Sequence, residues 1–152
     1  MTTLALHIRR AHSADREAIS SLLHQLGYEA TPAHVAQRLA AIQDSPADLV
    51  LVATQGEAVI GCIGLHILPM FHASGSLGRI TSLVIDEACR GRRVGSALMN
   101  AAADWFAQQG CVKMEVTSGN RRLDAHRFYE AHGMTRDSQR FAKAIEQASD
   151  PK

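Results

Sequence analysis

Residues 79–117 read RITSLVIDEACRGRRVGSALMNAAADWFAQQGCVKMEVT, and the order of elements in this stretch decides the fold. Residues 79–85 and 112–117 predict two strands. The segment between them predicts a helix over 94–108 that Gly110 closes. Its apolar side chains recur at helical spacing, at Val94, Leu98, Ala101 and Trp105. A strand, a long crossover helix and a second strand form a βαβ unit, so we expect the two strands to be parallel.

The rest of the chain indicates a hairpin and further helices. Strands are expected over 48–54 and 58–68, joined by a turn around Gly56. The hairpin and the βαβ unit together predict a mixed sheet with helices on its faces. The other expected elements are a strand over 4–11, a helix with Ser13 as N-cap that ends at Gly27, a second helix that begins at Thr31-Pro32 with Val35, Leu39 and Ile42 inward, a helix over 122–132 and a last strand over 139–145.

The composition is that of a globular protein and argues against several classes of function. With 152 residues, 46% of them hydrophobic and 20% charged, the chain predicts one soluble domain over 1–152. The 16 Lys and Arg against 15 Asp and Glu give a formal net charge of +1, which argues against nucleic-acid binding. No run approaches the roughly 18 apolar residues of a membrane span. Residues 1–10 lack the basic leader and cleavage site of a signal peptide.

The cysteines and histidines predict neither a disulfide framework nor a metal site. Cys62, Cys89 and Cys111 are odd in number and far apart, so we expect reduced thiols in a cytoplasmic protein. None of the eight histidines forms an HxxxH pair with matching Cys or carboxylate ligands, so we expect no bound metal.

The stretch CRGRRVGSAL (89–98) concentrates positive charge between a predicted strand and a predicted helix start. A helix N-terminus presents unpaired N–H groups and a partial positive charge, which favour an anion. We therefore expect a phosphate or pyrophosphate site, with a merely solvated basic loop as the alternative. Neither GxxxxGK[ST] nor GxGxxG is present, so a P-loop or dinucleotide fold is not expected. The arginines and glycines concerned are Arg90, Arg92, Arg93, Gly91 and Gly95.

Two stretches resemble the signatures of one enzyme family. LVIDEACRGRRVGSAL (83–98) is similar to the cofactor motif R/Q-x-x-G-x-G/A of the GCN5-related N-acetyltransferases. NRRLDAHRFYEAHGM (120–134) resembles that family's second signature. The resemblance implies an α/β fold with a mixed, largely antiparallel twisted sheet of about six to seven strands. About four helices would flank the sheet, and a parallel, splayed strand pair would form the cofactor cleft.

The resemblance also implies the reaction and the residues that perform it. An acetyl group would move from acetyl-CoA to a primary amine by direct attack, with no acyl-enzyme. Tyr129 would protonate the departing thiolate, which is chemically reasonable because a phenol has a pKa near 10 and a thiol near 8.5. One N–H of the strand would polarise the thioester carbonyl. Cofactor binding would fall to Leu83, Val84, Ile85, Arg90, Gly91, Arg92, Arg93, Val94, Gly95, Ser96 and Asn120.

Several of these residues have simpler interpretations, and two positions depart from the family pattern. Tyr129 beside Phe128 also fits a core position, and Asn120 also fits a helix N-cap. Arg93 stands where the family usually has glycine, which is tolerated if its φ is negative. Many relatives carry a glutamate base on the strand before the loop, but this strand offers Thr81 and Ser82. Neither hydroxyl is a base at neutral pH, so the candidates for the base are Glu115, Asp86, His66, His72 or water alone, and the choice among them stays open.

The acceptor is less well specified than the cofactor. In the family, the acceptor site comes from the first two helices and a strand–strand loop, here 13–43 and 69–78. The C-terminal third looks like that of small-molecule acetyltransferases, including aminoalkylphosphonate acetylases, so a small amine is expected. The alternatives are a protein N-terminus or lysine, a non-catalytic acetyl-CoA sensor, and a basic loop that docks on nucleic acid. Many relatives are dimers, so a homodimer is considered beside the monomer.

Overall fold

The computed structural model describes residues 4–117 and 123–148. The chain forms two compact units, Met1–Gly119 and Asn120–Lys152. None of the helices in the described residues is both long and apolar enough to cross a membrane.

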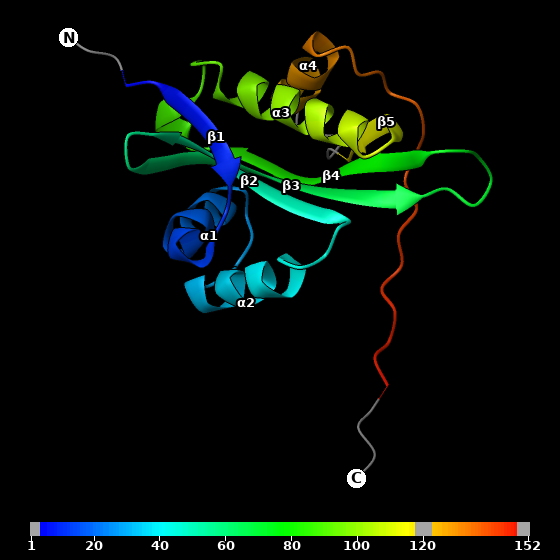
Figure 1. Cartoon of the computed structure of the whole chain (residues 1–152), viewed down its shortest axis with the longest axis horizontal. Helices are drawn as coiled ribbons and strands as arrows, with labels where there is room; N and C mark the ends of the chain where they lie inside the picture. Colours follow the sequence, from blue (N-terminus) through cyan, green and yellow to red (C-terminus); the bar gives the residue numbers. More distant parts are fainter. Residues whose placement is uncertain (1–3, 118–122, 149–152) are drawn as a thin grey trace. The chain divides into compact units, whose positions relative to one another are not determined.

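The first unit is a five-stranded sheet in which the strands follow their order along the chain (Figure 1). All neighbours are antiparallel except β4 and β5, which are parallel, so the expected βαβ unit is confirmed. The crossover helix α3 runs from Val94 to Gln108, the bounds expected from the sequence. The strands are β1 (Leu6–Arg10), β2 (Asp48–Gln55), β3 (Ala58–Pro69), β4 (Ser76–Ile85) and β5 (Cys111–Val116).

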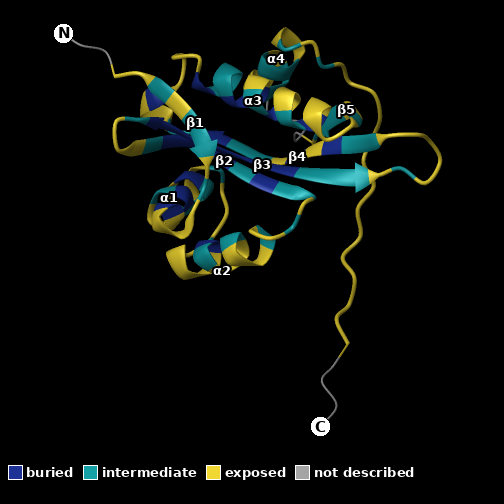
Figure 2. Cartoon of the chain, viewed as in Figure 1, coloured by how far each residue is buried: buried dark blue, intermediate teal, exposed yellow. Residues whose placement is uncertain are grey.

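Helices cover both faces of this sheet. α1 (Arg16–Gln25) and α2 (Pro32–Ile42) lie on one face, and α3 lies on the other (Figure 1). The core between the first two helices and the sheet is apolar and largely buried (Figure 2). It consists of Ile19, Leu22, Val35, Val52, Cys62 and Val84, with Leu39 packed against it.

α3 packs very closely on the opposite face of the sheet. The Phe106 ring lies against Gly78, where a Cβ would come within 2.6 Å of ring carbons, so only glycine fits there. In the second half of α3, the buried residues lie one position later in the sequence than expected. Its buried residues are Val94, Leu98, Met99, Ala102 and Phe106, whereas Ala101 and Trp105 are half-buried.

The two N-terminal helices begin differently. Thr31 caps α2 as expected, because its Oγ1 accepts the His34 N–H at 3.1 Å. Ser13 does not cap α1, which begins only at Arg16 after a short 3₁₀ turn, so that expectation was wrong. The Asp15 side chain does not cap α1 either; it stabilises the preceding 3₁₀ turn, because its carboxylate accepts the His12 N–H at 2.9 Å.

The second unit contains one regular element in the described residues. α4 (Leu123–Ala131) ends before Gly133, whose φ of 81° suits a C-terminal glycine. The expected strand over 139–145 was wrong, because the chain after the helix forms no regular structure. Phe141 and Ile145 are 92% and 82% exposed. The sheet therefore has five strands in the described residues, not six to seven.

Candidate functional site

The parallel strands β4 and β5 separate before β4 ends. Their ladder runs from the Ser76–Cys111 pair to the Ile80–Val116 pair. β4 then continues to Ile85, paired with β3 on its other edge. Along residues 81–85, the open edge therefore presents backbone N–H and C=O groups that have no strand partner in the described part of the chain. Leu83, Val84 and Ile85 lie in this stretch, as the splayed pair requires.

A β-bulge marks the point where the strands part. Gly64 pairs with Ser82, and Leu65 pairs with Ile80, so Thr81 is the extra residue. The bulge brings two consecutive hydroxyl side chains over Gly64. A Cβ on that glycine would lie 2.7 Å from Thr81 Oγ1 and 3.1 Å from Ser82 Oγ. Glycine is thus needed opposite the bulge.

The loop after β4 is tied to the end of α1. Asp86 N–H donates to the Ile60 carbonyl at 2.8 Å. Its carboxylate accepts the Ala88 N–H at 3.3 Å and the Gln25 side-chain amide at 3.4 Å. Gln25 Oε1 in turn accepts the Glu87 N–H at 3.0 Å. These contacts fix where the loop leaves the sheet, and sequence reasoning did not find Gln25 because no local signal connects it to the loop.

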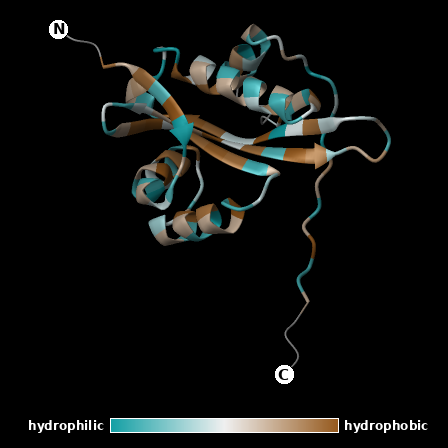
Figure 3. Ribbon diagram, in the orientation of Figure 1, coloured by the Kyte–Doolittle hydropathy of each residue, from teal (hydrophilic) through white to brown (hydrophobic). Residues whose placement is uncertain are grey.

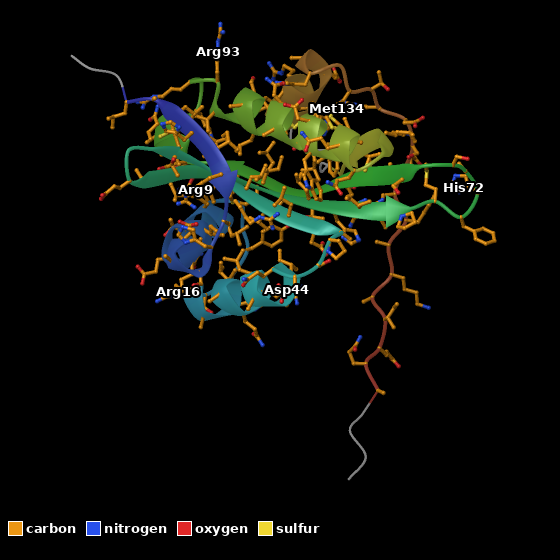
Figure 4. All side chains as sticks on the ribbon, in the orientation of Figure 1. Arg9, Arg16, Asp44, His72, Arg93 and Met134 are labelled. Carbon is orange, nitrogen blue, oxygen red and sulfur yellow. The ribbon has the colours of Figure 1, made fainter. Side chains whose placement is uncertain are left out.

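The arginine loop opens directly onto the N-terminus of α3. Arg90, Arg92 and Arg93 are all exposed, and the Arg93 side chain points away from the fold (Figure 4). Arg93 is the N-cap residue of α3, but its side chain makes no capping hydrogen bond to the helix. Because the first N–H groups of a helix lack intrahelical acceptors, this end of α3 combines open donors with three guanidinium groups. It is suited to an anion.

The backbone of this loop departs from the sequence expectation at Arg93. Its φ is 64° and its ψ is 17°, in the left-handed region, whereas a negative φ was the condition for tolerating a side chain there. The conformation is the one that the family's usual glycine adopts without strain. Gly91, with a φ of 82°, meets a similar requirement two residues earlier.

A cavity of about 370 Å³ lies between α1, α2 and the sheet. Cys62, Gly64 and Ser82 form its strand side, so it reaches the bulge. Its helix side comes from the expected range 13–43, and no residue of 69–78 lines it. The lining is mainly apolar. Figure 3 shows many hydrophobic residues along the strands of the sheet. The helix side of the cavity adds the exposed polar side chains Tyr28, Glu29, His34 and Arg38.

Cys62 is not a nucleophile of this cavity. Burial raises the pKa of its thiol to about 12, so the thiolate is scarce at neutral pH. All three cysteines are free. Among the residues that the structure describes, no three His, Cys, Asp or Glu side chains are grouped to hold a metal ion.

A row of charged and polar side chains crosses the sheet beside the cavity. Asp48, His66, Arg79 and Glu115 are successive register partners on β2, β3, β4 and β5. They form two pairs: His66 Nδ1 lies 2.7 Å from Asp48 Oδ1, and Arg79 Nε donates to Glu115 Oε1 at 2.9 Å. Sequence reasoning missed Asp48, because strand register is not visible in a local pattern.

The four candidate bases have very different surroundings. Glu115 is held by the Arg79 guanidinium, and Asp86 caps the loop. His72 lies on the loop at the tip of the β3–β4 hairpin, exposed and beyond the ends of the strands (Figure 4). His66 lies on the sheet itself, on the same face as the cavity residue Gly64, two positions away.

The second signature falls in the other unit. Tyr129 is half-buried on α4, and the Phe128 ring packs edge-on against it with the ring centroids 5.4 Å apart. Asn120 lies outside the described residues. The first signature, residues 83–98, thus runs from the end of β4 through the arginine loop into α3, whereas Tyr129 lies on α4 in the second unit.

Comparison with known proteins identifies the family. The model of the acetyltransferase (GNAT) family matches residues 16–134. The chain belongs to this family. As a GNAT protein it is an N-acetyltransferase, and the family generally uses acetyl-CoA as co-substrate. The aminoalkylphosphonate N-acetyltransferase of Salmonella typhimurium is 31% identical over 143 residues, which cover 91% of this chain and 90% of that protein.

Solved structures agree with the fold. A transcriptional regulator from Bacillus halodurans superposes with a TM-score of 0.85 at 23% identity, covering 93% of this chain and 100% of that one. Glucosamine-6-phosphate N-acetyltransferase from Arabidopsis thaliana gives a TM-score of 0.80, also at 23% identity, with 93% and 99% covered. At these identities the likeness concerns the fold alone.

Proposed function

We propose that this protein transfers the acetyl group of acetyl-CoA to the primary amine of a small molecule. The observation that carries the proposal is the continuity of the open β4 edge with the arginine loop and the N-terminus of α3. An extended pantetheine arm fits the edge, and a pyrophosphate fits the loop. The family match over 16–134 spans both compact units, which supports treating them as one acetyltransferase domain.

The cofactor would lie along β4 like an added strand. The N–H and C=O groups of Leu83, Val84 and Ile85 would pair with the amides of the pantetheine arm. One of these N–H groups, next to the bulge, would polarise the thioester carbonyl. The exposed arginines and the N–H groups of the loop would bind the pyrophosphate, and Gly91 would allow the sharp turn. The complete pyrophosphate set is Arg90, Gly91, Arg92, Arg93, Val94, Gly95 and Ser96.

The chemical step would be direct transfer. The neutral amine attacks the thioester carbon, and the CoA thiolate leaves. Tyr129 would donate the proton that the thiolate takes, and Asn120 would contact the cofactor. The high pKa of Cys62 supports a mechanism without an acyl-enzyme, because no activated thiol is available in the cavity.

The acceptor would occupy the cavity under α2. Its apolar lining suits the carbon skeleton of a small amine, and its strand side reaches Ser82 at the bulge, next to the proposed thioester position. Arg38 and His34 at the helix end suit an anionic group on the acceptor. The relative from Salmonella typhimurium, by its name, acetylates an aminoalkylphosphonate, which combines an amine with an anion.

The free cysteines support a cytoplasmic location.

Thiol release from acetyl-CoA tests this function. We would compare 2-aminoethylphosphonate, β-alanine, 2-phenylethylamine and a lysine-containing peptide as acceptors. We expect release with a small amine, and a large loss of kcat in Tyr129→Phe with little change in acetyl-CoA affinity. No release with any small amine, although acetyl-CoA binds, would contradict a small-molecule acetyltransferase. The remaining functions would then be a non-catalytic acetyl-CoA sensor or an acetyltransferase with a macromolecular acceptor.

Cofactor binding can be tested separately by calorimetry with acetyl-CoA. Arg90→Gln should weaken binding about tenfold, because a charge-assisted contact to phosphate contributes about 1.5 kcal/mol or more. Arg10→Gln is the matched control, since Arg10 is equally exposed but lies on β1. Equal affinities of the two variants would show that the loop does not bind the pyrophosphate.

A further inference from the structure

Three polar side chains form a chain of hydrogen bonds that ends beside the cavity. Ser45 Oγ donates to Asp48 Oδ2 at 2.8 Å, and His66 Nδ1 lies 2.7 Å from the other oxygen, Oδ1. Ser45 is itself held, because its Oγ accepts the Ala47 N–H at 3.3 Å. Both oxygens of the Asp48 carboxylate are therefore engaged, and its position determines that of the imidazole.

The imidazole lies next to the strand side of the cavity. Residues two apart on a strand share a face and lie about 7 Å apart, so His66 is the next side chain on this face after Gly64. Gly64 and its partner Ser82 line the cavity at the bulge. The His66 side chain is 38% exposed, so it is reachable without any change in packing.

The hydrogen bond to Asp48 selects the tautomer of His66. A carboxylate accepts only, so the neutral ring carries its proton on Nδ1 and its lone pair on Nε2. Within the residues that the structure describes, Nε2 has no hydrogen-bond partner. An imidazole oriented by a carboxylate, with its second nitrogen open, is an arrangement suited to proton abstraction.

The charges around His66 are compatible with this role. Asp48 faces it from β2 and Arg79 from β4, and Glu115 on β5 neutralises Arg79. α2, which packs on the same face, carries Arg38, and Asp44 follows the helix. Of the charges on its neighbouring strands, only that of Asp48 is therefore left to pair with the imidazole.

We propose that His66 is the general base of the acetyl transfer and that Asp48 and Ser45 are positioning residues; this inference rests on the proposed function. His66 Nε2 takes one proton from the acceptor ammonium. The amine then attacks the thioester carbon, so that a C–N bond forms and the C–S bond breaks. The thiolate leaves as the thiol with the proton of Tyr129, and the second proton of the attacking nitrogen returns to that phenolate. The proton on His66 passes to water.

Thiol release with the best acceptor of the panel, measured against pH, tests the assignment. His66→Gln should lower kcat by about 10²–10⁴-fold, leave acetyl-CoA affinity unchanged and move the acid limb of the kcat/KM profile to higher pH. Part of the rate should return at high pH, where the amine is already neutral. His7→Gln is the matched control, because His7 is exposed on β1 and should keep wild-type kinetics.

Two further variants separate catalysis from a structural role. In His66→Ala, added imidazole should restore part of the rate, which a purely structural histidine would not allow. Asp48→Asn should lower kcat and shift the acid limb without raising the KM for acetyl-CoA, and Asp48→Glu should recover part of the loss. Wild-type kinetics in His66→Gln would overturn the role of His66 alone. Absence of thiol release in the wild-type protein would overturn the acetyl transfer and the base together.

Discussion

The left-handed backbone at Arg93 leads to a prediction about the stability of the protein without bound cofactor. A residue with a Cβ in this conformation is strained by about 1–2 kcal/mol. Glycine removes that strain but loses about 0.5–1 kcal/mol through the greater freedom of the unfolded chain. The Arg93 side chain is exposed and caps nothing. Arg93→Gly should therefore stabilise the fold by about 0.75 kcal/mol, the middle of the difference of about 0–1.5 kcal/mol between the two terms.

Arg93→Ala is the matched variant, because alanine removes the same charge and keeps the strain. Its stability should equal that of the wild type within a few tenths of a kcal/mol. In urea denaturation, an m-value of about 2 kcal/mol/M converts the gain of Arg93→Gly into a midpoint shift of roughly 0.3–0.5 M. Acetyl-CoA affinity should fall alike in both variants. Equal urea midpoints for the glycine and alanine variants would refute the left-handed assignment.

Two other predictions concern packing and pH. Gly78→Ala should destabilise the fold by about 1–3 kcal/mol, because its Cβ would meet the buried Phe106 ring at 2.6 Å; thermal unfolding measures the loss. Asp15→Asn should remove stability that the wild type has at neutral pH. The Arg9 guanidinium, bonded at 2.8 and 2.9 Å, and the His12 N–H hold the pKa of Asp15 below its usual range despite burial.

Each of these predictions has its own control. Phe106→Leu combined with Gly78→Ala should recover part of the lost stability, and strictly additive losses would contradict the clash. The Asp15 contribution is present above the pKa of an unfolded aspartate, about 3.9, and disappears as the pH falls through the lower folded value. Wild type and Asp15→Asn should thus converge in acid. A stability difference that persists there would contradict the ion pair as its source.

Local signals located the main elements and the arginine loop. The periodicity of 94–108 and the glycine after it predicted α3 with its correct bounds, because a helix and its C-terminus are determined by residues close in sequence. The same holds for the Thr31 cap and for the arginine loop, whose charges and glycines are consecutive. At the start of α1 the pattern chose the wrong residue, because Ser13 lies in a 3₁₀ turn that precedes the helix.

Long-range contacts decided everything that depends on strand register. Residues 139–145 are predicted as a strand yet pair with no strand in the described part of the chain, because a strand requires backbone partners that no local pattern supplies. The bulge at Thr81, the cavity at Ser82 and the pairing of Asp48 with His66 arise in the same way. The sequence alone predicted most of the elements, α3 among them, and led to the expectation of an anion site at the arginine loop. Only the tertiary structure decided which side chains meet, since register is set by the packing of whole faces.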